Sequence, residues 1–347
     1  MKKKIAILGH FGGDQDFLDG QTVKTKILYN ELKEKTDWDI QKIDTYWKRK
    51  NPIKLLFCTL SALIAKKDVI VLLSINGMKL FFPILSFFAK IWNVRIYHDV
   101  IGGSLDKYVE QYPKFKKYLN SFTVNWVETE ILKNGLKNNG VLNCKVIPNF
   151  KKLNILSEEE LPDRFDPPFR FCTFSRVMKE KGIETAIKAI EEINREKGYE
   201  FCTLDIYGAV DNAYKKRFNA ITAKTGKAIS YCGLVPYDKS VDVLKDYYAL
   251  LFPTYWKGEG FPGTIVDAFS AGLPVVASDW NSNKEIISHC INGLLYPNVK
   301  IASLKDGIKN LIDNTDMVMK MKLNCIRDAK KYQPDSYVNY IVSVLAR

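Results

Sequence analysis

Residues 247–285 read YYALLFPTYWKGEGFPGTIVDAFSAGLPVVASDWNSNKE, and this stretch predicts strand, loop, helix, strand and loop in turn. Its apolar run ALLF is followed by a proline, which is typical of a buried parallel strand. Pro262 suits the first position of a helix, where the missing N–H costs nothing. The helix should run to about Ala271, because Gly-Leu-Pro follows and stops it. Such a unit predicts an α/β fold with a parallel sheet.

Two carboxylates stand beside the start of this predicted helix. The free backbone N–H groups and the helix dipole make such a start a site for anions. Glu259 lies in the loop just before it, and Asp267 lies eight residues further on, on the helical face of Gly263 and Ser270. A ligand with both phosphate and hydroxyl groups, such as a nucleotide sugar, fits this pattern. Equally open is a solvated Glu and a surface Asp on an ordinary crossover helix.

The chain has 347 residues, enough for about two domains. Two consecutive alternations of strands and helices predict an N-terminal domain over 1–155 and a C-terminal domain over 169–334. The acidic and proline-containing stretch 156–168 is expected to link them. The final helix, 335–347, follows a complete second domain and is expected to join the first.

The charge of the chain is uneven. Residues 1–155 hold 26 Lys and Arg against 14 Asp and Glu, whereas residues 156–347 hold 26 against 25. A basic first domain is expected to meet something anionic: a phospholipid surface, a diphosphate-bearing substrate or nucleic acid. Nucleic acid is not expected as a partner, because the lysines are spread along helices and no nucleic-acid reading motif is present.

Residues 102–122 interleave aromatic side chains with lysines at helical spacing. One interpretation is an interfacial segment on an anionic membrane, which would make the protein peripheral to the membrane. The other is an aromatic stripe that faces the core and a lysine face in solvent. The residues alone leave both open.

No secretory signal or spanning segment is expected, and a cytoplasmic location is predicted. The most apolar segment, 80–92, is shorter than the roughly 20 residues that cross a bilayer. The seven cysteines show no paired spacing, and no metal site is predicted. Cys172, Cys202 and Cys232 lie in strand-like segments and are expected to be buried core residues.

The first domain opens with a strand over 4–9 and a glycine-rich loop, a layout that can hold phosphate. The loop lacks both G-x-G-x-x-G and G-K-[ST], so neither a dinucleotide fingerprint nor a P-loop is supported. His98 and Asp99 end the predicted strand 95–99, at the edge where open α/β sheets bind ligands. A lone His is more often structural, but this position favours a functional role.

Taken together, these segments resemble the retaining family 4 glycosyltransferases of bacterial surface-polysaccharide synthesis. The resemblance is strongest over 171–296, in SRVMKEKGIETAIKA, LDIYGAV and GEGFPGTIVDAFSAGLPVVAS. In the first domain the resemblance rests on three segments, which are GGDQDFLDGQTVKT, the His98–Asp99 pair and VIPNF. The resemblance implies the GT-B architecture: two Rossmann-like parallel-sheet domains that face each other across a donor cleft.

The resemblance also implies roles for individual residues. Arg176 and Lys181 would neutralise the donor diphosphate without a metal, so no cofactor is expected. Glu259 and His98 would face the donor sugar, and Asp267 would accept hydrogen bonds from the ribose. Seven further residues would lie along the donor, which would be a UDP- or GDP-hexose. They are Gly12, Gly13, Gly208, Gly233, Gly260, Phe261 (through its backbone N–H) and Gly263.

This sequence departs from the family pattern in places. Asp267 replaces the second glutamate, Ser175 stands where glycine is usual, and Ala209 and Val210 stand where a second glycine is expected. The expected function is hexosyl transfer to a lipid-linked saccharide at the inner face of the plasma membrane. The alternatives are a nucleotide-sugar epimerase or phosphorylase on the same fold, and a non-catalytic subunit that binds nucleotide sugar.

Overall fold

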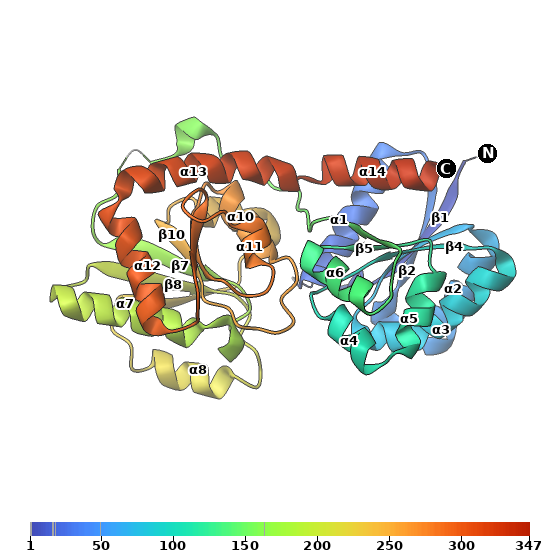
Figure 1. Ribbon diagram of the computed structural model, residues 1–347, viewed down its shortest axis with the longest axis horizontal. Coiled ribbons are helices and arrows are strands. Elements are labelled where there is room, and N and C mark those ends of the chain that lie inside the picture. The colour runs from blue at the N-terminus through green and yellow to red at the C-terminus, as the bar shows by residue number, and fades with distance from the viewer. Residues whose placement is uncertain (1, 16, 18, 49, 163) are drawn as a thin grey trace. The chain divides into compact units, whose positions relative to one another are not determined.

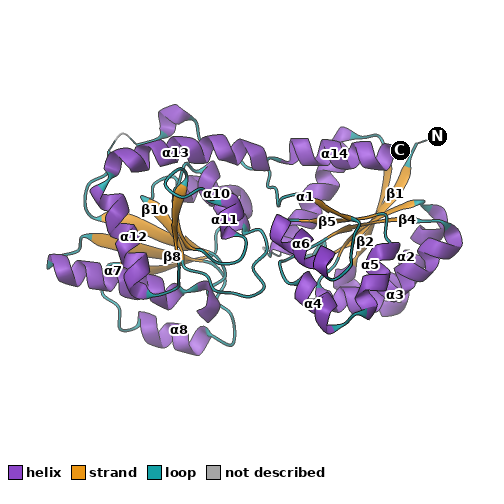
Figure 2. Ribbon diagram, in the orientation of Figure 1, coloured by secondary structure: helices purple, strands orange, loops and turns teal. Residues whose placement is uncertain are grey.

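A computed structural model of the chain describes residues 2–15, 17, 19–48, 50–162 and 164–347 (Figure 1). The chain forms two compact units, one from Met1–Lys152 with Gln333–Arg347 and the other from Leu153–Tyr332. Each unit holds one six-stranded sheet (Figure 2). In the described part of the chain, every pair of neighbouring strands within these sheets is parallel. The α/β fold class predicted from the sequence is therefore confirmed.

The sheet of the first unit has the order β2-β1-β3-β4-β5-β6. Its helices and strands are β1 Lys4–Gly9, α1 Gly20–Lys35, β2 Asp39–Asp44, α2 Pro52–Ala65, β3 Asp68–Leu72, α3 Ile75–Trp92, β4 Arg95–Asp99, α4 Leu105–Gln111, α5 Lys114–Ser121, β5 Val124–Val127, α6 Glu130–Asn138, β6 Cys144–Val146 and α14 Pro334–Ala346.

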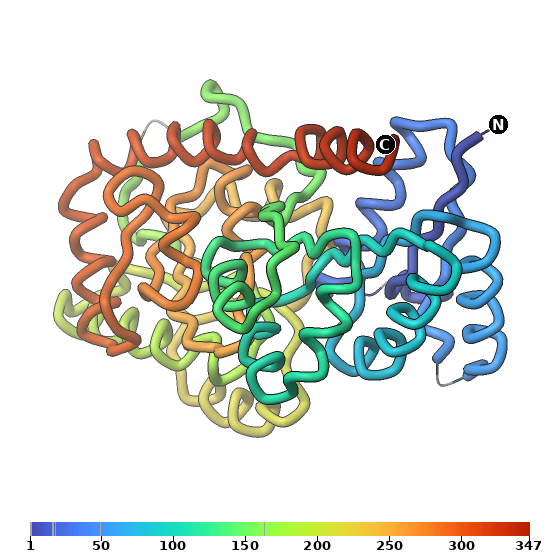
Figure 3. Tube along the Cα trace, turned by 45° about the vertical axis from the view of Figure 1, so that its right-hand side comes forward, coloured from blue at the N-terminus to red at the C-terminus, as the bar shows by residue number. Residues whose placement is uncertain are grey.

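Alternate residues of β1 divide the core of this unit into two layers. Ala6 and Leu8 belong to the cluster that α2 to α6 cover. Ile5 and Ile7 belong to the opposite cluster, which α1 and α14 cover. The tube in Figure 3 shows α14, at the red end of the chain, beside α1, and the two helices are in contact. The C-terminal helix thus completes one face of the N-terminal sheet.

The sheet of the second unit has the order β12-β11-β10-β7-β8-β9. Its elements are β7 Phe169–Phe174, α7 Ile183–Lys197, β8 Cys202–Tyr207, α8 Lys215–Thr222, β9 Ile229–Gly233, α9 Ser240–Leu244, β10 Ala249–Phe252, α10 Gly263–Ser270, β11 Val275–Ser278, α11 Asn283–Ile286, β12 Gly293–Tyr296, α12 Ile301–Asp313 and α13 Thr315–Ala329. The helices α7, α8 and α12 pack on one face of the sheet, and α9 and α10 pack on the other. The helix α13 contributes to both core layers, with Val318 and Met321 in the first and Cys325 and Ala329 in the second.

The structure decides between the two interpretations of residues 102–122. Phe115 is 1% exposed, and Tyr108 and Tyr118 pack against the same core cluster. The lysines at 107, 114, 116 and 117 are exposed, and Tyr112 alone of these aromatic residues is exposed. The segment therefore turns its aromatic stripe inward, and the interfacial interpretation of this segment is wrong.

One cysteine prediction is also wrong. Cys172 and Cys202 are buried as expected, but Cys232 is exposed. Cys232 lies on β9, which forms the edge of its sheet and pairs with β8 alone. An edge strand has fewer neighbours to cover it, so its apolar sequence did not guarantee burial.

Among the described residues, no helix combines the length and the low polarity that a bilayer crossing requires.

Candidate functional site

In the second sheet, the strand order changes direction between the neighbouring strands β7 and β10. From β7 the chain continues to β8 and β9 on one side, and from β10 to β11 and β12 on the other. In open α/β sheets ligands bind outside the carboxyl ends of the two strands at such a point. Arg176 follows the end of β7, and Thr254 follows the end of β10.

A buried ion pair joins the segments that follow these two strands. The Nζ of Lys181 lies 2.6 Å from Oε2 of Glu259, and the residues are 8% and 5% exposed. The Thr254 hydroxyl donates to the same carboxylate oxygen at 2.9 Å. The ammonium group also lies 5.2 Å from the ring centroids of Phe252 and of Trp256. Glu259 is thus not the solvated residue of the alternative interpretation.

The loop that carries Glu259 is held by side chains from the loop after β11. Trp280 Nε1 donates to the Trp256 carbonyl at 2.9 Å. Asn281 donates to the carbonyl of Glu259, and Ser282 donates to that of Gly260. No function was assigned to these three residues from the sequence. Their polar run directly after a predicted strand was the signal that could have identified them.

Asp267 lies within α10, and it is 2% exposed. Its Oδ1 accepts a hydrogen bond of 2.8 Å from the Ser240 hydroxyl, at the start of α9. The interpretation of Asp267 as a surface residue is therefore wrong. The opposite face of α10 packs inward as predicted, with Ile265, Ala268 and Phe269 fully buried.

The position predicted for Pro262 is wrong by one residue. Pro262 precedes the helix as its N-cap, with φ −70° and ψ 109°, and Gly263 is the first helical residue. The extended ψ of Pro262 turns the chain from the loop into the helix. The helix start remains directly after Glu259, Gly260 and Phe261, as the sequence predicts.

Arg176 is exposed, and within the described part of the chain its guanidinium has no ion-pair partner. Gly208, at φ 134°, lies so near that a Cβ there would stand 1.9 Å from the Ser175 carbonyl oxygen. Only glycine permits this approach of the loop after β8 to the loop that carries Arg176.

Ala209 and Val210 stand where a second glycine was expected from the resemblance. They form backbone contacts with the loop that carries Arg176. Val177 N–H donates to the Ala209 carbonyl at 2.9 Å, and Asp211 N–H donates to the Val177 carbonyl at 2.9 Å. Val177 and Val210 form a parallel bridge. Gly233 ends β9 at φ 80°, and its carbonyl accepts from Gly208 N–H at 2.8 Å.

In the first unit, His98 is fully buried at the end of β4. Its Nδ1 lies 3.0 Å from Oδ1 of Asn125, whose amide nitrogen donates to other oxygens, so Nδ1 carries the proton. Nε2 has no hydrogen-bond partner in the described structure. Burial lowers the pKa of His98 to about 4. The ring is therefore neutral at neutral pH and can accept a hydrogen bond at Nε2.

Beside His98, Asp99 belongs to a buried charged cluster whose other members, Lys24 and Glu128, sequence reasoning missed. Lys24 Nζ lies 2.7 Å from Oδ1 of Asp99 and 3.1 Å from Oε1 of Glu128. Burial disfavours the ammonium charge, but the two carboxylates outweigh burial and raise the pKa of Lys24. Burial raises the pKa of Asp99, against the opposing effect of Lys24. The cluster ties α1 to the ends of β4 and β5.

In the glycine-rich loop after β1, Gly12 and Gly13 adopt positive φ, at 90° and 57°. The Asp44 carboxylate accepts from the N–H groups of Phe11 and Gly13, at 2.9 and 2.8 Å. A Cβ on Gly13 would stand 2.4 Å from the ring of Tyr46. Residues 16 and 18 of the predicted loop lie outside the described residues.

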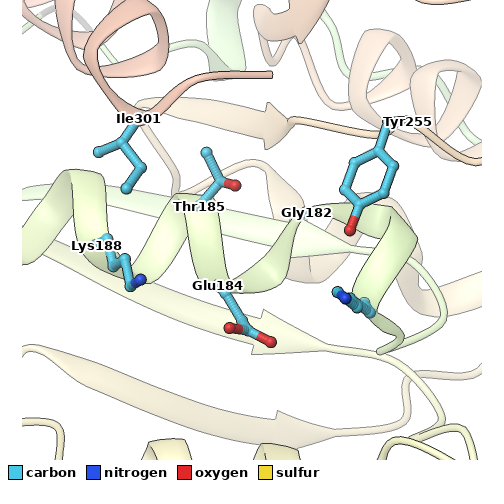
Figure 4. Close-up of a pocket in the computed structure, with 7 residues that line it drawn as sticks. Gly182, Glu184, Thr185, Lys188, Tyr255 and Ile301 are labelled. Atoms are coloured by element: carbon cyan, nitrogen blue, oxygen red, sulfur yellow. The ribbon is translucent and has the colours of Figure 1, made fainter.

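The second unit also has a pocket of about 170 Å³, whose lining includes residues on either side of Lys181 in the chain (Figure 4). It is lined by Lys179, Gly182, Glu184, Thr185, Lys188, Tyr255 and Ile301. None of the predicted site residues lines it. We place the candidate site at the carboxyl ends of β7 and β10, because the buried charged pair lies there. Among the described residues, no group of three or more His, Cys, Asp or Glu side chains could hold a metal ion.

Known proteins resemble the chain in sequence and in fold. It is 34% identical over 130 residues to the UDP-N-acetylglucosamine–peptide N-acetylglucosaminyltransferase GtfA subunit of Streptococcus agalactiae, covering 37% of this chain and 24% of that protein. It is 25% identical over 142 residues to the amylovoran biosynthesis glycosyltransferase AmsK of Erwinia amylovora, covering 40% and 34%. The chain thus spans about a quarter to a third of the length of these relatives.

The structure of HepE from Anabaena in complex with UDP matches the whole fold. The TM-score is 0.71 at 13% identity, over 100% of both chains. This likeness identifies the arrangement of two parallel sheets as the GT-B fold expected from the sequence.

The family model described as "Glycosyl transferases group 1" matches residues 158–332. This segment contains every element that builds the candidate site of the second unit, from β7 to α11. The chain therefore belongs to the group 1 glycosyl transferases.

Proposed function

We propose that this protein is a retaining glycosyltransferase that moves a hexose from a nucleoside diphosphate sugar to a saccharide acceptor. The observation that carries the proposal is the buried Lys181–Glu259 pair at the point where the second sheet reverses direction. A cation and a carboxylate fixed side by side suit a ligand with a diphosphate next to a sugar.

Arg176 and Lys181 would stabilise the leaving nucleotide. The bond between the anomeric carbon and the diphosphate oxygen breaks, and the diphosphate keeps the electron pair. The acceptor hydroxyl oxygen bonds to that carbon, and its proton passes to the departing phosphate. Negative charge therefore grows on the diphosphate, where a planar guanidinium and an ammonium group are most effective. We expect transfer to persist in EDTA, because these two cations would do this work.

The remaining donor contacts follow from the positions of the side chains and backbone. Glu259 would hold sugar hydroxyls, and Asp267 the ribose hydroxyls. The backbone N–H groups of Gly260, Phe261 and Gly263 at the start of α10 would bind phosphate or sugar. Pro262 lies between them and has no backbone N–H group. The other residues proposed for donor binding are Gly208 and Gly233, with His98, Gly12 and Gly13 from the first unit.

A UDP-sugar is the donor we propose to test first, because the HepE complex holds UDP and the GtfA relative is named for a UDP-sugar. For the acceptor we propose a lipid-linked saccharide in bacterial surface-glycan synthesis, at the inner face of the plasma membrane. The AmsK relative, named for amylovoran biosynthesis, and the basic first unit support this acceptor.

A thermal-shift series with UDP-, GDP- and ADP-hexoses tests donor binding. A donor at 100 times its dissociation constant should stabilise the protein by about 2.7 kcal/mol. Arg176→Ala should weaken the shift and slow transfer by about 10² to 10³, the usual cost of losing one such stabiliser. Its unfolding temperature without donor should match the wild type, because Arg176 is exposed. Full transfer by both Arg176→Ala and Glu259→Ala would refute the site.

A non-catalytic subunit that binds nucleotide sugar is the second candidate. It is favoured by Asp267, which is shorter than the usual glutamate and is already bonded to Ser240. An assay with and without acceptor separates the candidates. The transferase releases nucleotide in step with glycosylated lipid, whereas the subunit binds donor without turnover. An epimerase or phosphorylase would act on the donor with no saccharide acceptor present.

A further inference from the structure

Two neighbouring helices of the first unit expose large apolar side chains. On α2 they are Ile53, Leu56, Phe57 and Ile64, and on α3 they are Leu80, Phe87 and Ile91. The exposed fractions are high: 82% for Ile53, 71% for Phe57 and 58% for Phe87. The two helices contact each other, and Figure 1 shows them together on the first unit. We call these seven residues the α2–α3 surface.

The spacing of these residues places them on one stripe of each helix. In α2 positions 53, 57 and 64, and in α3 positions 80, 87 and 91, recur at the helical period. Other residues of the same helices already fill the core, among them Leu63 and Phe82, both nearly or fully buried. Each helix is therefore apolar on two sides, and the described residues of the unit leave the outer side exposed.

Basic residues surround the α2–α3 surface. Residues 46–94 contain eight Lys and Arg and one acidic residue, Asp68. Asp68 is 2% exposed, and its Oδ1 lies 2.6 Å from Nε of Arg95. Neither helix contains an Asp or Glu, while Lys54, Lys79 and Lys90 on these helices are exposed. The exposed charged residues on the two helices are therefore all lysines, and just after α2 the buried Lys66 pairs with the exposed carboxylate of Asp39 at 2.5 Å.

We propose that the α2–α3 surface docks the protein on an anionic phospholipid bilayer, with both helices lying along the membrane. Apolar side chains enter the boundary between headgroups and acyl chains, while lysines beside them meet lipid phosphates. A second copy of the chain is a poor occupant, because it would bring two basic surfaces together. The α4–α5 segment is a poor alternative, because its aromatic residues face the core.

This inference names a surface for the membrane side of the proposed function, but it stands apart from the donor site. Sedimentation with vesicles needs neither donor nor acceptor, so its failure leaves the transferase proposal untouched. Conversely, a chain that binds vesicles but transfers no sugar would refute the proposed function alone.

The test uses the full chain with vesicles of phosphatidylcholine, with and without phosphatidylglycerol. The wild type should sediment with the anionic vesicles only, and added salt should release it. Lys54→Gln with Lys90→Gln should weaken binding about thirtyfold, because each lysine near such a surface is worth about 1 kcal/mol. Phe57→Ser with Phe87→Ser should weaken it more than tenfold, through lost apolar contact.

Matched controls locate the surface. Lys114→Gln with Lys117→Gln removes two exposed lysines from α5, and Leu142→Ser removes an apolar side chain that is 76% exposed elsewhere in the same unit. Both controls should bind vesicles as the wild type does. The proposal is overturned if the wild type does not sediment or if the controls lose as much binding. It is also overturned if the phenylalanine variant dissolves an oligomer without changing vesicle binding.

Discussion

Lys181 and Glu259 are 78 positions apart, yet their charged groups lie 2.6 Å from each other in the candidate site. Removing one partner of such a buried pair leaves the other charge without compensation, at a cost of about 3–5 kcal/mol. Lys181→Met and Glu259→Gln should therefore each lower the free energy of unfolding in urea. The double variant should lose clearly less than the sum of the two.

The exposed pair Lys239–Asp242 provides the control for this experiment. Its atoms lie 3.4 Å apart with both side chains more than half exposed, so Lys239→Met should change stability too little to measure. Strictly additive losses at positions 181 and 259 would contradict the pairing. Activities of the single variants should be compared only where both remain folded.

His98 should make the first unit sensitive to acid. Its pKa is lowered to about 4 in the folded chain by burial, against 6.5 for an ordinary histidine. Below pH 6.5 the histidine of the unfolded chain binds a proton, whereas the buried His98 of the folded chain stays neutral. The free energy of unfolding therefore falls as the pH falls towards 4. The loss approaches about 1.4 kcal/mol per pH unit and about 3 kcal/mol in total.

Urea unfolding of the wild type and of His98→Gln between pH 7 and pH 4.5 measures this effect. The acid sensitivity of all other groups is common to both proteins, so the wild type should show the steeper decline. Parallel curves would mean that the folded chain protonates His98 as readily as the unfolded chain does, so that burial does not lower its pKa.

At the scale of whole elements, α14 should be essential to the first unit. Val338, Ile341 and Leu345 are fully buried in the core layer that contains Ile5 and Ile7. Ile341→Ala should cost about 2–5 kcal/mol, the range for truncating a buried aliphatic side chain. Amide hydrogen exchange should accelerate in β1 and α1. The exposed neighbour Asn339→Ala should have little effect, and faster exchange confined to β7 would contradict this account.

Most elements could be predicted from the sequence, because strands such as β1 and β4 are short, largely apolar runs that end at glycine or polar residues. Boundaries differed by a residue or two, as they did for Pro262. The helix α12 was not predicted, although its apolar positions Leu304, Ile308 and Leu311 are fully buried. From the sequence, Lys181 and Glu259 were both expected in the second-unit site, and their assignment to that site stays a prediction. The sequence could not predict that Lys181 bonds to Glu259, since contacts between distant residues depend on strand order.

The same limit explains the Lys24–Asp99–Glu128 cluster. Its members lie 75 and 104 positions apart and meet only because β4 and β5 are neighbours in the sheet. The misplaced aromatic stripe of 102–122 has a different cause. Periodicity shows that a helix has an apolar side, but it does not say whether core or solvent lies against that side.

For the molecule as a whole, thiol chemistry offers a test of the fold. Cys232 and Cys290 are exposed, whereas Cys172, Cys202 and Cys325 are buried. In the native protein, Cys290 should react rapidly with a thiol reagent and Cys232 more slowly. Although Cys232 is an exposed residue, partial burial of its thiol and the nearby Asp205 raise the pKa of that thiol. The three buried thiols should react only on unfolding. Serine variants at 232 and 290 should each remove one native signal, and rapid labelling of Cys172 would contradict the fold.

The place of α14 has a consequence for how the protein is made. A ribosome releases the whole of 153–332 before it releases the helix that completes the first sheet. At about 5–20 residues per second, that interval is about 10–40 s. Throughout it the layer around Ile5 and Ile7 lacks the cover of Val338, Ile341 and Leu345. The nascent N-terminal unit therefore has a built-in period in which chaperones can recognise it, and its maturation waits for synthesis of its neighbour.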